Sequence, residues 1–454
     1  MESTGVAEGL DSRIDGWRTY VLAHAGVEPN VAAVEARLRA HALALCGAGL
    51  SEEEAFLVAL RRVAESDEVS GSLTRAYAEK HWSGPVDTDT EEASTRTGTT
   101  EFWVMLGCAV AAAIAIKVPT LFGFEFDGPD GGFFARNLSL FVLPLLAIYF
   151  VWKRRPAATA VMGVAGAFVA GAVFTNAYPF LPGGSTEVLT AIHLPIALWL
   201  AVGVAYVGGE WRSHSRRMEY VRFTGEWLVN YALIALGGGV LVALSIGVFD
   251  AIGLDAEPFV EDWILALAMG AVIVAAWLVE TRRALIGGMA PMLARVFTPL
   301  FALMLIALLV GVGWTSGVID IEREALILFD LLLVVVVALV LYGISARDPL
   351  AGPRVFDWVQ LVLVVCALTV DVFALVNIAA RLSEYGFSAN RMAALGLNLI
   401  LLVNLGWSAR LQAGFLRRLH GFDHIERWQM RYLPVYALWA AIVVIAFPPL
   451  FGLA

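Results

Sequence analysis

Apolar residues recur in long blocks from Glu101 to the end of the chain, and short polar segments separate the blocks. A helix needs about 20 apolar residues to cross the hydrocarbon core of a membrane, which is the length of these blocks. The sequence therefore predicts an all-α fold, with a polytopic transmembrane helical bundle in residues 101–454. We expect eleven spans, near residues 102–121, 134–152, 157–174, 189–208, 227–249, 263–279, 297–314, 325–344, 358–380, 392–411 and 433–451.

Residues 10–82 carry a different pattern, in which apolar side chains recur every three or four residues. This spacing is typical of helices that bury one face, and we expect about four helices in a small N-terminal domain. Ser51 and Glu54 form a capping box, which predicts that the third helix starts here. Two apolar stripes precede this point: Leu10, Ile14, Trp17 and Val21, then Val31, Val34, Leu38 and Leu45.

A polar stretch and a change of charge separate the two parts of the chain. Residues 83–100 lack apolar periodicity and predict a flexible linker between the N-terminal domain, residues 1–82, and the membrane domain. Residues 1–100 carry 9 Lys and Arg against 17 Asp and Glu, so most of the net charge of −10 lies before the first span. We therefore expect a soluble, acidic head that is tethered to the membrane domain.

The N-terminal domain also carries a family resemblance. The run Ala48–Val58 (AGLSEEEAFLV), together with Leu10-Asp11, Trp17-Arg18 and the closing segment Glu79–Trp82, resembles the permease prefix domain. That module stands at the N-terminus of various bacterial membrane proteins, including permeases of ABC export systems. The resemblance implies a cytoplasmic interaction or regulatory module without catalytic residues. A helical cap with no partner beyond its own membrane domain is the alternative.

Composition and charge exclude several classes of function. Hydrophobic residues make up 59% of the chain and charged residues 16%, which is too little charge to cover the surface of a soluble protein of this length. The sequence has no cluster of basic residues of the kind that binds nucleic acid, so we expect no nucleic-acid partner. The three cysteines lie far apart, so we expect neither disulfides nor a cysteine metal site. His420, Asp423 and His424 have spacing that metals tolerate, but a solvated basic loop is the favoured interpretation, and we expect no metal or cofactor.

The distribution of Lys and Arg predicts the orientation of the chain. With the N-terminal domain in the cytoplasm, 17 of the 22 Lys and Arg of residues 101–454 fall in cytoplasmic segments. This asymmetry follows the positive-inside rule, so we expect a multi-pass protein of the bacterial inner (cell) membrane. Eleven spans place the N-terminus in the cytoplasm and the C-terminus outside. We expect residues 285–299 to lie along the inner interface before the seventh span.

Ionisable side chains at membrane depth are costly and mark candidate sites. Asp330 lies about two turns into the eighth predicted span, and Asp371 lies near the middle of the ninth. Lys117 and Arg136 lie near the ends of the first two spans, where pairing or extension toward the interface explains them. His193, in the fourth span, is better explained by packing than by titration. Asp330 and Asp371 are therefore the primary candidates for binding a substrate or an ion.

The predicted outer hairpin between the ninth and tenth spans is the second candidate region. It adds Arg381, Glu384 and Arg391, while Asn377 and Asn398 lie in the flanking spans. Ser388 or Asn390 is expected to cap the tenth helix, and Asp330, Asp371 and Glu384 are expected partners of the two arginines. The Tyr385-Gly386 and Asn390-Arg391 pairs resemble the signature of a bacterial membrane family, domain of unknown function 4153, over residues 282–417. The family implies no activity, and a structural clamp is the alternative to a ligand site.

Two functions fit these observations. The first is a permease or transporter-like component that moves or flips a small or lipid-like substrate. The alternative is a regulatory or scaffolding membrane protein whose N-terminal domain recruits a cytoplasmic partner through residues 10–82. An enzyme is not expected, because no nucleophile–base or metal arrangement is present in the sequence. The expected partner is the lipid bilayer, and the sequence is also compatible with a homo-oligomer. A cavity lined by Asp371, Arg391 and Asn398 would favour transport, whereas a fully packed bundle would favour a scaffold.

Overall fold

A computed structural model describes most of the membrane domain and part of the N-terminal domain. The described residues are 10, 13–19, 21, 31–47, 52–66, 88–126, 128, 130–251, 257–282, 290–314, 323–347 and 352–452. The chain divides into two compact units, Met1–Thr99 and Thr100–Ala454. We describe each unit by itself.

The N-terminal unit is helical in its described parts. Residues 13–19 are helical, and α2 (Val31–Gly47) and α3 (Glu52–Ser66) pack against each other. The predicted apolar stripes are confirmed, because they supply most of the core: Leu10, Ile14, Trp17, Val21, Val31, Val34, Leu38, Ala42, Phe56, Leu57, Ala59, Leu60 and Val63. The start of α3 at Glu52 agrees with the capping box. Ser51 and the predicted fourth helix, over residues 69–82, lie outside the described residues.

Part of the expected linker is helical. The first membrane helix, α5 (Thr88–Ala115), begins inside the range 83–100, and residues 83–87 lie outside the described part of the chain. Extending an existing helix needs no new nucleation, so a span readily propagates into flanking polar residues. Sequence periodicity missed this extension because the added turns have no apolar face.

The membrane unit is built from helices joined by short connections. Among the described residues, eleven helices are long and apolar enough to cross a membrane, as the sequence predicts. The chain is therefore a polytopic integral membrane protein with an all-α fold. After α5 and a short 3₁₀ turn, η1 (Val118–Phe122), the helices are α6 (Gly131–Arg154), α7 (Ala158–Ala177), α8 (Ser185–Tyr206), α9 (His214–Ala251), α10 (Glu257–Arg282), α11 (Ala290–Trp314), α12 (Arg323–Ser345), α13 (Val355–Tyr385), α14 (Ala389–Leu416) and α15 (Asp423–Leu450).

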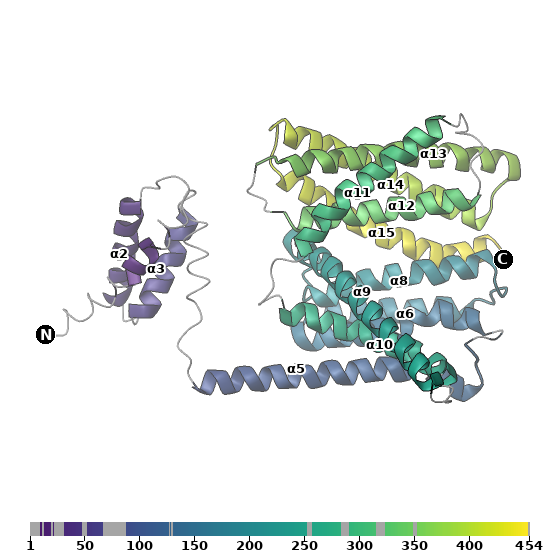
Figure 1. The fold of residues 1–454 in the computed structure, drawn as a ribbon, viewed down its shortest axis with the longest axis horizontal. Coiled ribbons are helices and arrows are strands. Elements are labelled where there is room, and N and C mark those ends of the chain that lie inside the picture. The colour runs from purple at the N-terminus through teal and green to yellow at the C-terminus, as the bar shows by residue number, and fades with distance from the viewer. Residues whose placement is uncertain are drawn as a thin grey trace. The chain divides into compact units, whose positions relative to one another are not determined.

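Two hydrophobic cores lie side by side in this unit. The first is formed mainly by α5, α6, α8 and α10, with Tyr149, Phe150 and Phe223 fully buried at its centre. The second is formed mainly by α11 to α15. Contacts between α8 and α15 join the two halves. Figure 1 shows that α9 and α11 cross the other helices diagonally, while most of their neighbours run nearly parallel to one another.

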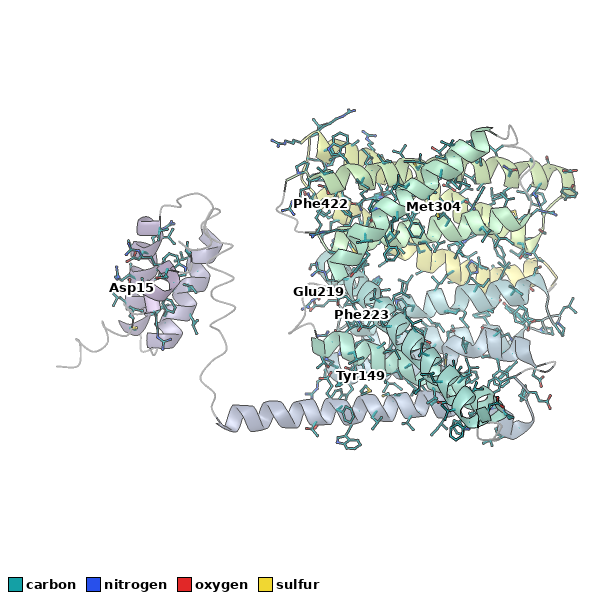
Figure 2. The ribbon with its side chains drawn as sticks, viewed as in Figure 1. Asp15, Tyr149, Glu219, Phe223, Met304 and Phe422 are labelled. Atoms are coloured by element: carbon teal, nitrogen blue, oxygen red, sulfur yellow. The ribbon has the colours of Figure 1, made fainter. Side chains whose placement is uncertain are left out.

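The outer surface of the membrane unit is apolar. Leu236, Leu303, Leu331 and Val403 expose 54% to 68% of their surface although they lie in the middle of spans. In a soluble protein such a surface would aggregate, but here it matches the hydrocarbon core of a bilayer. The side chains in Figure 2 show this covering, with Met304 on the outward face of α11.

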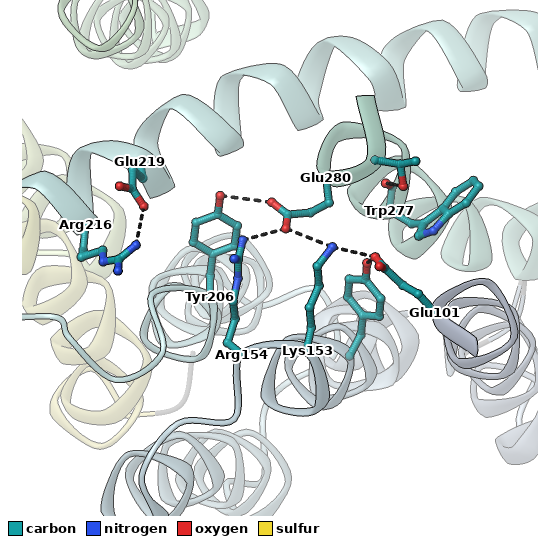
Figure 3. A network of polar contacts seen from close by, with 10 residues as sticks. Glu101, Lys153, Arg154, Tyr206, Arg216, Glu219, Trp277 and Glu280 are labelled. Carbon is teal, nitrogen blue, oxygen red and sulfur yellow. Dashed lines mark hydrogen bonds and ion pairs between the residues drawn. The ribbon is translucent and has the colours of Figure 1, made fainter. Parts of the chain in front are cut away.

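One end of the membrane unit gathers basic side chains that tie helices together, and we call it the basic end (Figure 3). Lys153 and Arg154 of α6 both contact the Glu280 carboxylate of α10, at 3.2 and 2.7 Å. Lys153 also pairs with Glu101 of α5 at 2.6 Å, and Tyr206 of α8 donates to Glu280 at 3.2 Å. Four helices therefore meet in one network of alternating charges.

Two further arginines fasten α9 to the second core at the basic end. Arg217 donates to the carbonyl of Met430 in α15, and Arg222 donates to the carbonyl of Ser345 in α12. Nearby, Arg347 forms a bidentate pair with Asp357, with both contacts at 2.9 Å, and joins α12 to α13. These basic residues, which the hydropathy pattern places in loops between spans, thus join the ends of neighbouring helices through hydrogen bonds and an ion pair.

Two expectations about this unit are corrected. The segment 285–299 was expected along the interface, but α11 begins at Ala290, so its second part belongs to the span; residues 283–289 lie outside the described chain. Pro291 stands in the first turn of α11, where a missing amide hydrogen costs nothing. Likewise, α9 begins at His214, thirteen residues before the expected span at 227.

Candidate functional site

An apolar groove lies at the boundary between the two cores. Its volume is about 810 Å³, within the range of pockets that hold small ligands. Seven helices supply its walls: α6, α8, α9, α10, α12, α14 and α15. The lining includes Ile192, His193, Trp199, Trp227, Leu228, Tyr231, Asp330, Leu331, Val334, Ala338, Tyr436 and Trp439. The remaining lining residues are almost all aliphatic, so water gains little by filling the groove.

The mouth of the groove opens on the surface that faces lipid. Ile192 of α8, Leu228 of α9, and Leu331 and Val334 of α12 line the groove, and each is between 42% and 60% exposed. All four lie within spans rather than at their ends. A molecule in the groove is therefore reached sideways, from the hydrocarbon region of the bilayer.

Aromatic side chains form one wall of the groove. The rings of Trp199 and Trp227 lie 4.4 Å apart, and Tyr231 stacks on Trp227 at 5.3 Å. Hydrogen bonds hold the two indoles, because Trp199 donates to the Thr224 hydroxyl at 3.1 Å and Trp227 donates to the Val272 carbonyl at 3.0 Å. The polar edges of both indoles are satisfied, so the two tryptophans line the groove without an unpaired donor.

Trp439 forms the facing part of the lining. A Cβ atom on Gly396 of α14 would overlap its ring, so glycine is needed for this close approach. The buried indole nitrogen of Trp439 has no hydrogen-bond partner among the described residues. Tyr436, three residues before Trp439 on α15, accepts a hydrogen bond from Asn404 at 2.6 Å.

Asp330 is the carboxylate on the groove wall. Asn398 of α14 donates to Asp330 Oδ1 at 2.7 Å, which orients the carboxyl group of α12. The sequence identified both residues as candidates, and the structure brings them together across 68 positions of the chain. Asn398 is fully buried, and its own carbonyl oxygen has no partner in the described structure.

Asp371 lies behind this wall, in the protein interior. It is 0% exposed, and neither of its carboxyl oxygens has a hydrogen-bond partner among the residues described. It interacts electrostatically with Asp330, although it does not line the groove. Burying an unpartnered carboxyl group is expensive in any membrane protein. The structure therefore places two acidic groups together at a cost that packing does not explain.

The hairpin between α13 and α14 does not join this acidic pair. Arg391 donates to the backbone carbonyls of Tyr385 and Gly386, at 3.0 and 2.6 Å, instead of pairing with Asp330 or Asp371 as expected. Its guanidinium lies 5.5 Å from the Tyr385 ring centre. Ser388 accepts from the amide of Arg391 at 3.4 Å, so the predicted cap of α14 is confirmed. This arrangement favours a structural clamp, which satisfies carbonyls at the end of α13.

The remaining sequence candidates of this region lie apart from the groove. Asn377 is buried on α13 and donates to the carbonyl of Phe373 at 2.9 Å. Arg381 and Glu384 act electrostatically on Tyr385, at the hairpin end of α13. Of the seven candidate residues, the groove is lined by Asp330 alone. A cavity lined by Asp371, Arg391 and Asn398, the arrangement expected for a transporter, is not what the described residues form.

Other ionisable or unusual residues have structural explanations. Arg136 pairs with the buried Glu187 of α8, and Lys117 lies over the Phe126 ring at 5.2 Å. His193 lines the groove with its Nδ1 2.8 Å from the Leu189 carbonyl. At the basic end, Asp423 pairs with both His424 and Arg427.

A polar network between α14 and α15 was missed by the sequence reasoning. Asn404 donates to Gln429 and Tyr436 and accepts from the indole of Trp428 at 2.8 Å, while Gln429 donates to Ser408 at 2.6 Å. Its signal was the pair Asn404 and Ser408, one turn apart in an otherwise apolar span. All these groups find partners, so the network fixes how α14 and α15 pack.

Comparison with known proteins adds no identification. No known protein family, curated protein or solved structure matches the chain. The two resemblances found in the sequence therefore stay predictions.

Proposed function

We propose that this membrane protein binds a lipid or lipid-like amphiphile in the groove between its two cores and moves it within or across the bilayer. The observation that carries the proposal is the groove itself, which is large, apolar and open at membrane depth. A scaffold needs no such space, and packing energy is lost wherever helices leave one.

The walls of the groove support movement as well as binding. Their helices come from both cores, and α8 and α15 form one of the contacts that join the halves. A relative displacement of the two halves would change the width of the groove. Domain motions of this kind are the usual way in which transporters expose a site alternately to the two sides.

We place the protein in the bacterial cell membrane with its N-terminus in the cytoplasm and its C-terminus outside. The asymmetry of Lys and Arg supports this orientation. The predicted role of residues 10–82 is to recruit or sense a cytoplasmic partner, and the sequence resemblance to the permease prefix domain supports it. Neither point is needed for the groove to bind an amphiphile.

The proposal is tested in proteoliposomes that contain a fluorescent phospholipid with its label on the head group. A membrane-impermeant reductant bleaches only the outer leaflet unless the protein moves lipid between leaflets. We expect the wild-type protein to increase the bleached fraction. Ala338 lines the groove and is exposed, so Ala338→Trp should fill the space and abolish this increase.

The control variant is Ala379→Trp, which adds the same indole to an exposed position of α13 that does not line the groove. It should behave as the wild type does. If the wild-type protein bleaches no more lipid than empty liposomes, movement between leaflets is the wrong function. If both tryptophan variants are equally active, the groove is not the path.

A further inference from the structure

The groove combines a carboxylate with a lining that carries no positive side chain. Among the described lining residues, Asp330 is acidic and none is Lys or Arg. No Lys or Arg of the described lining is therefore placed to neutralise the Asp330 carboxylate from the groove wall. An occupant that brings its own positive charge would supply the counter-charge that a carboxylate in this environment requires.

The aromatic wall favours the same kind of occupant. Trp227 and Tyr231 of α9 stack on each other, and the Trp199 ring of α8 lies tilted against Trp227. Tyr436 and Trp439 line the groove from α15. Ring faces attract cations through their quadrupole, and tryptophan does so most strongly. Aromatic rings with a nearby carboxylate are the usual recognition surface for quaternary and other organic cations.

The second acidic residue, Asp371, is buried behind the wall and does not line the groove. Among the described residues, Asp330 is the charged group that acts on Asp371. Asn398 fixes Asp330 Oδ1 through its amide, so one carboxyl oxygen is held while the group still lines the groove.

We infer that the groove selects lipophilic organic cations, in which a positive centre is surrounded by apolar groups, and that Asp330 supplies their counter-charge. This inference rests on the proposed function, because it takes the groove as the site of an amphiphile and specifies the charge of that amphiphile. Trp199, Trp227 and Tyr231 contact the apolar shell of the cation.

Two probes of almost equal size and opposite charge test the charge preference directly. Tetraphenylphosphonium is a cation and tetraphenylborate is an anion, and both are apolar on their surface. Equilibrium dialysis of each probe against the purified full-length protein in a neutral detergent gives its affinity. We expect the wild-type protein to bind the phosphonium more tightly than the borate. Asp330→Asn should weaken phosphonium binding about tenfold or more, because a desolvated charge pair loses one partner.

The matched control is Asp250→Asn, which makes the same change at an exposed position near the end of α9. It should leave both affinities unchanged. Borate binding should be retained or increased in Asp330→Asn, which shows at the same time that this variant is folded.

The outcomes separate the charge preference from the proposed function. Equal wild-type affinities for the two probes, or phosphonium binding that survives Asp330→Asn unchanged, would overturn the inference. If Ala338→Trp still blocks both probes in that case, the groove binds amphiphiles without regard to charge, and the proposed function stands. If neither probe binds the wild-type protein, the groove is not a site for amphiphiles, and both proposals fall.

Discussion

At the scale of single residues, close contacts between glycine and aromatic rings shape the groove. Gly396 allows the Trp439 ring to lie directly against α14, and Gly225 allows the Tyr342 ring to approach α9 in the same way. Glycine is conformationally costly in a helix, so its presence at a contact indicates that the space is needed. Gly396 thereby fixes the position of Trp439 in the groove lining, whereas Tyr342 lies outside that lining.

We predict that Gly396→Ala destabilises the protein and narrows the groove. The added methyl group would overlap the Trp439 ring, and overpacking of this kind costs about 1–3 kcal/mol. Thermal unfolding in detergent measures the loss. Gly237→Ala is the control, because a Cβ at Gly237 meets no other atom within 4 Å. Equal stability of both variants would mean that Trp439 has room to move.

The glycine run of α9 shows how sequence alone can point to the wrong feature. Gly237, Gly238 and Gly239 suggest close helix packing or a kink, yet a Cβ at any of the three would meet no described atom within 4 Å, so the run makes no close packing contact there. Gly396, a single glycine in a different helix, makes the contact. A pattern along one helix does not reveal which of its faces meets a neighbour, and this is decided by tertiary packing.

At the scale of helices, charged side chains hold the bundle at the basic end. The Glu280 carboxylate is 4% exposed and contacts Lys153, Arg154 and Tyr206, which come from α6 and α8. Removing one partner of a buried pair leaves the others uncompensated. The network therefore controls how firmly α10 is held against the rest of the first core.

We predict that Glu280→Gln lowers the stability of the protein by about 1–3 kcal/mol, because the partly exposed Lys153 and Arg154 lose their shared charged partner. Chemical unfolding in detergent measures the effect. Glu219→Gln is the control, because the Arg216–Glu219 pair in Figure 3 is about half exposed on both sides, and we expect little change there. If the two variants lose similar stability, the Glu280 network carries no special role in packing.

The helices were predictable from the sequence, and the groove was not. Each span is a local property, since about 20 apolar residues suffice to define it, and all eleven appear. The groove depends on seven helices meeting, and the pairing of Asp330 with Asn398 joins positions far apart in the chain. The sequence identified both side chains because burying a polar group within a span costs free energy, but this cost does not reveal which residue the group pairs with. It also predicted acidic partners for Arg391, whereas Arg391 donates to the backbone carbonyls of Tyr385 and Gly386 at the end of α13.

At the scale of the whole molecule, the eleven spans of the described residues set the topology. Each span reverses the side of the chain, so consecutive connections alternate between the two faces of the membrane. The Arg- and Lys-rich connections fall on one face, which the positive-inside rule assigns to the cytoplasm.

We predict that cysteines on the two faces react differently in intact cells. Phe387, in the α13–α14 connection, is 79% exposed and should lie outside, and Ser215, at the start of α9, should lie inside. After replacement of Cys46, Cys108 and Cys366, a membrane-impermeant maleimide should label Phe387→Cys at once. Ser215→Cys should react only after permeabilisation. The reverse labelling pattern would invert the orientation.

The sideways mouth of the groove changes what counts as the concentration of a ligand. A molecule that enters between α8, α9 and α12 comes from the hydrocarbon phase, so occupancy follows its mole fraction in the bilayer and not its amount in water. A hydrophobic compound that partitions strongly will fill the site at low aqueous dose, and adding empty liposomes will drain it by dilution into lipid. Potency measured on cells will therefore vary with the total membrane present.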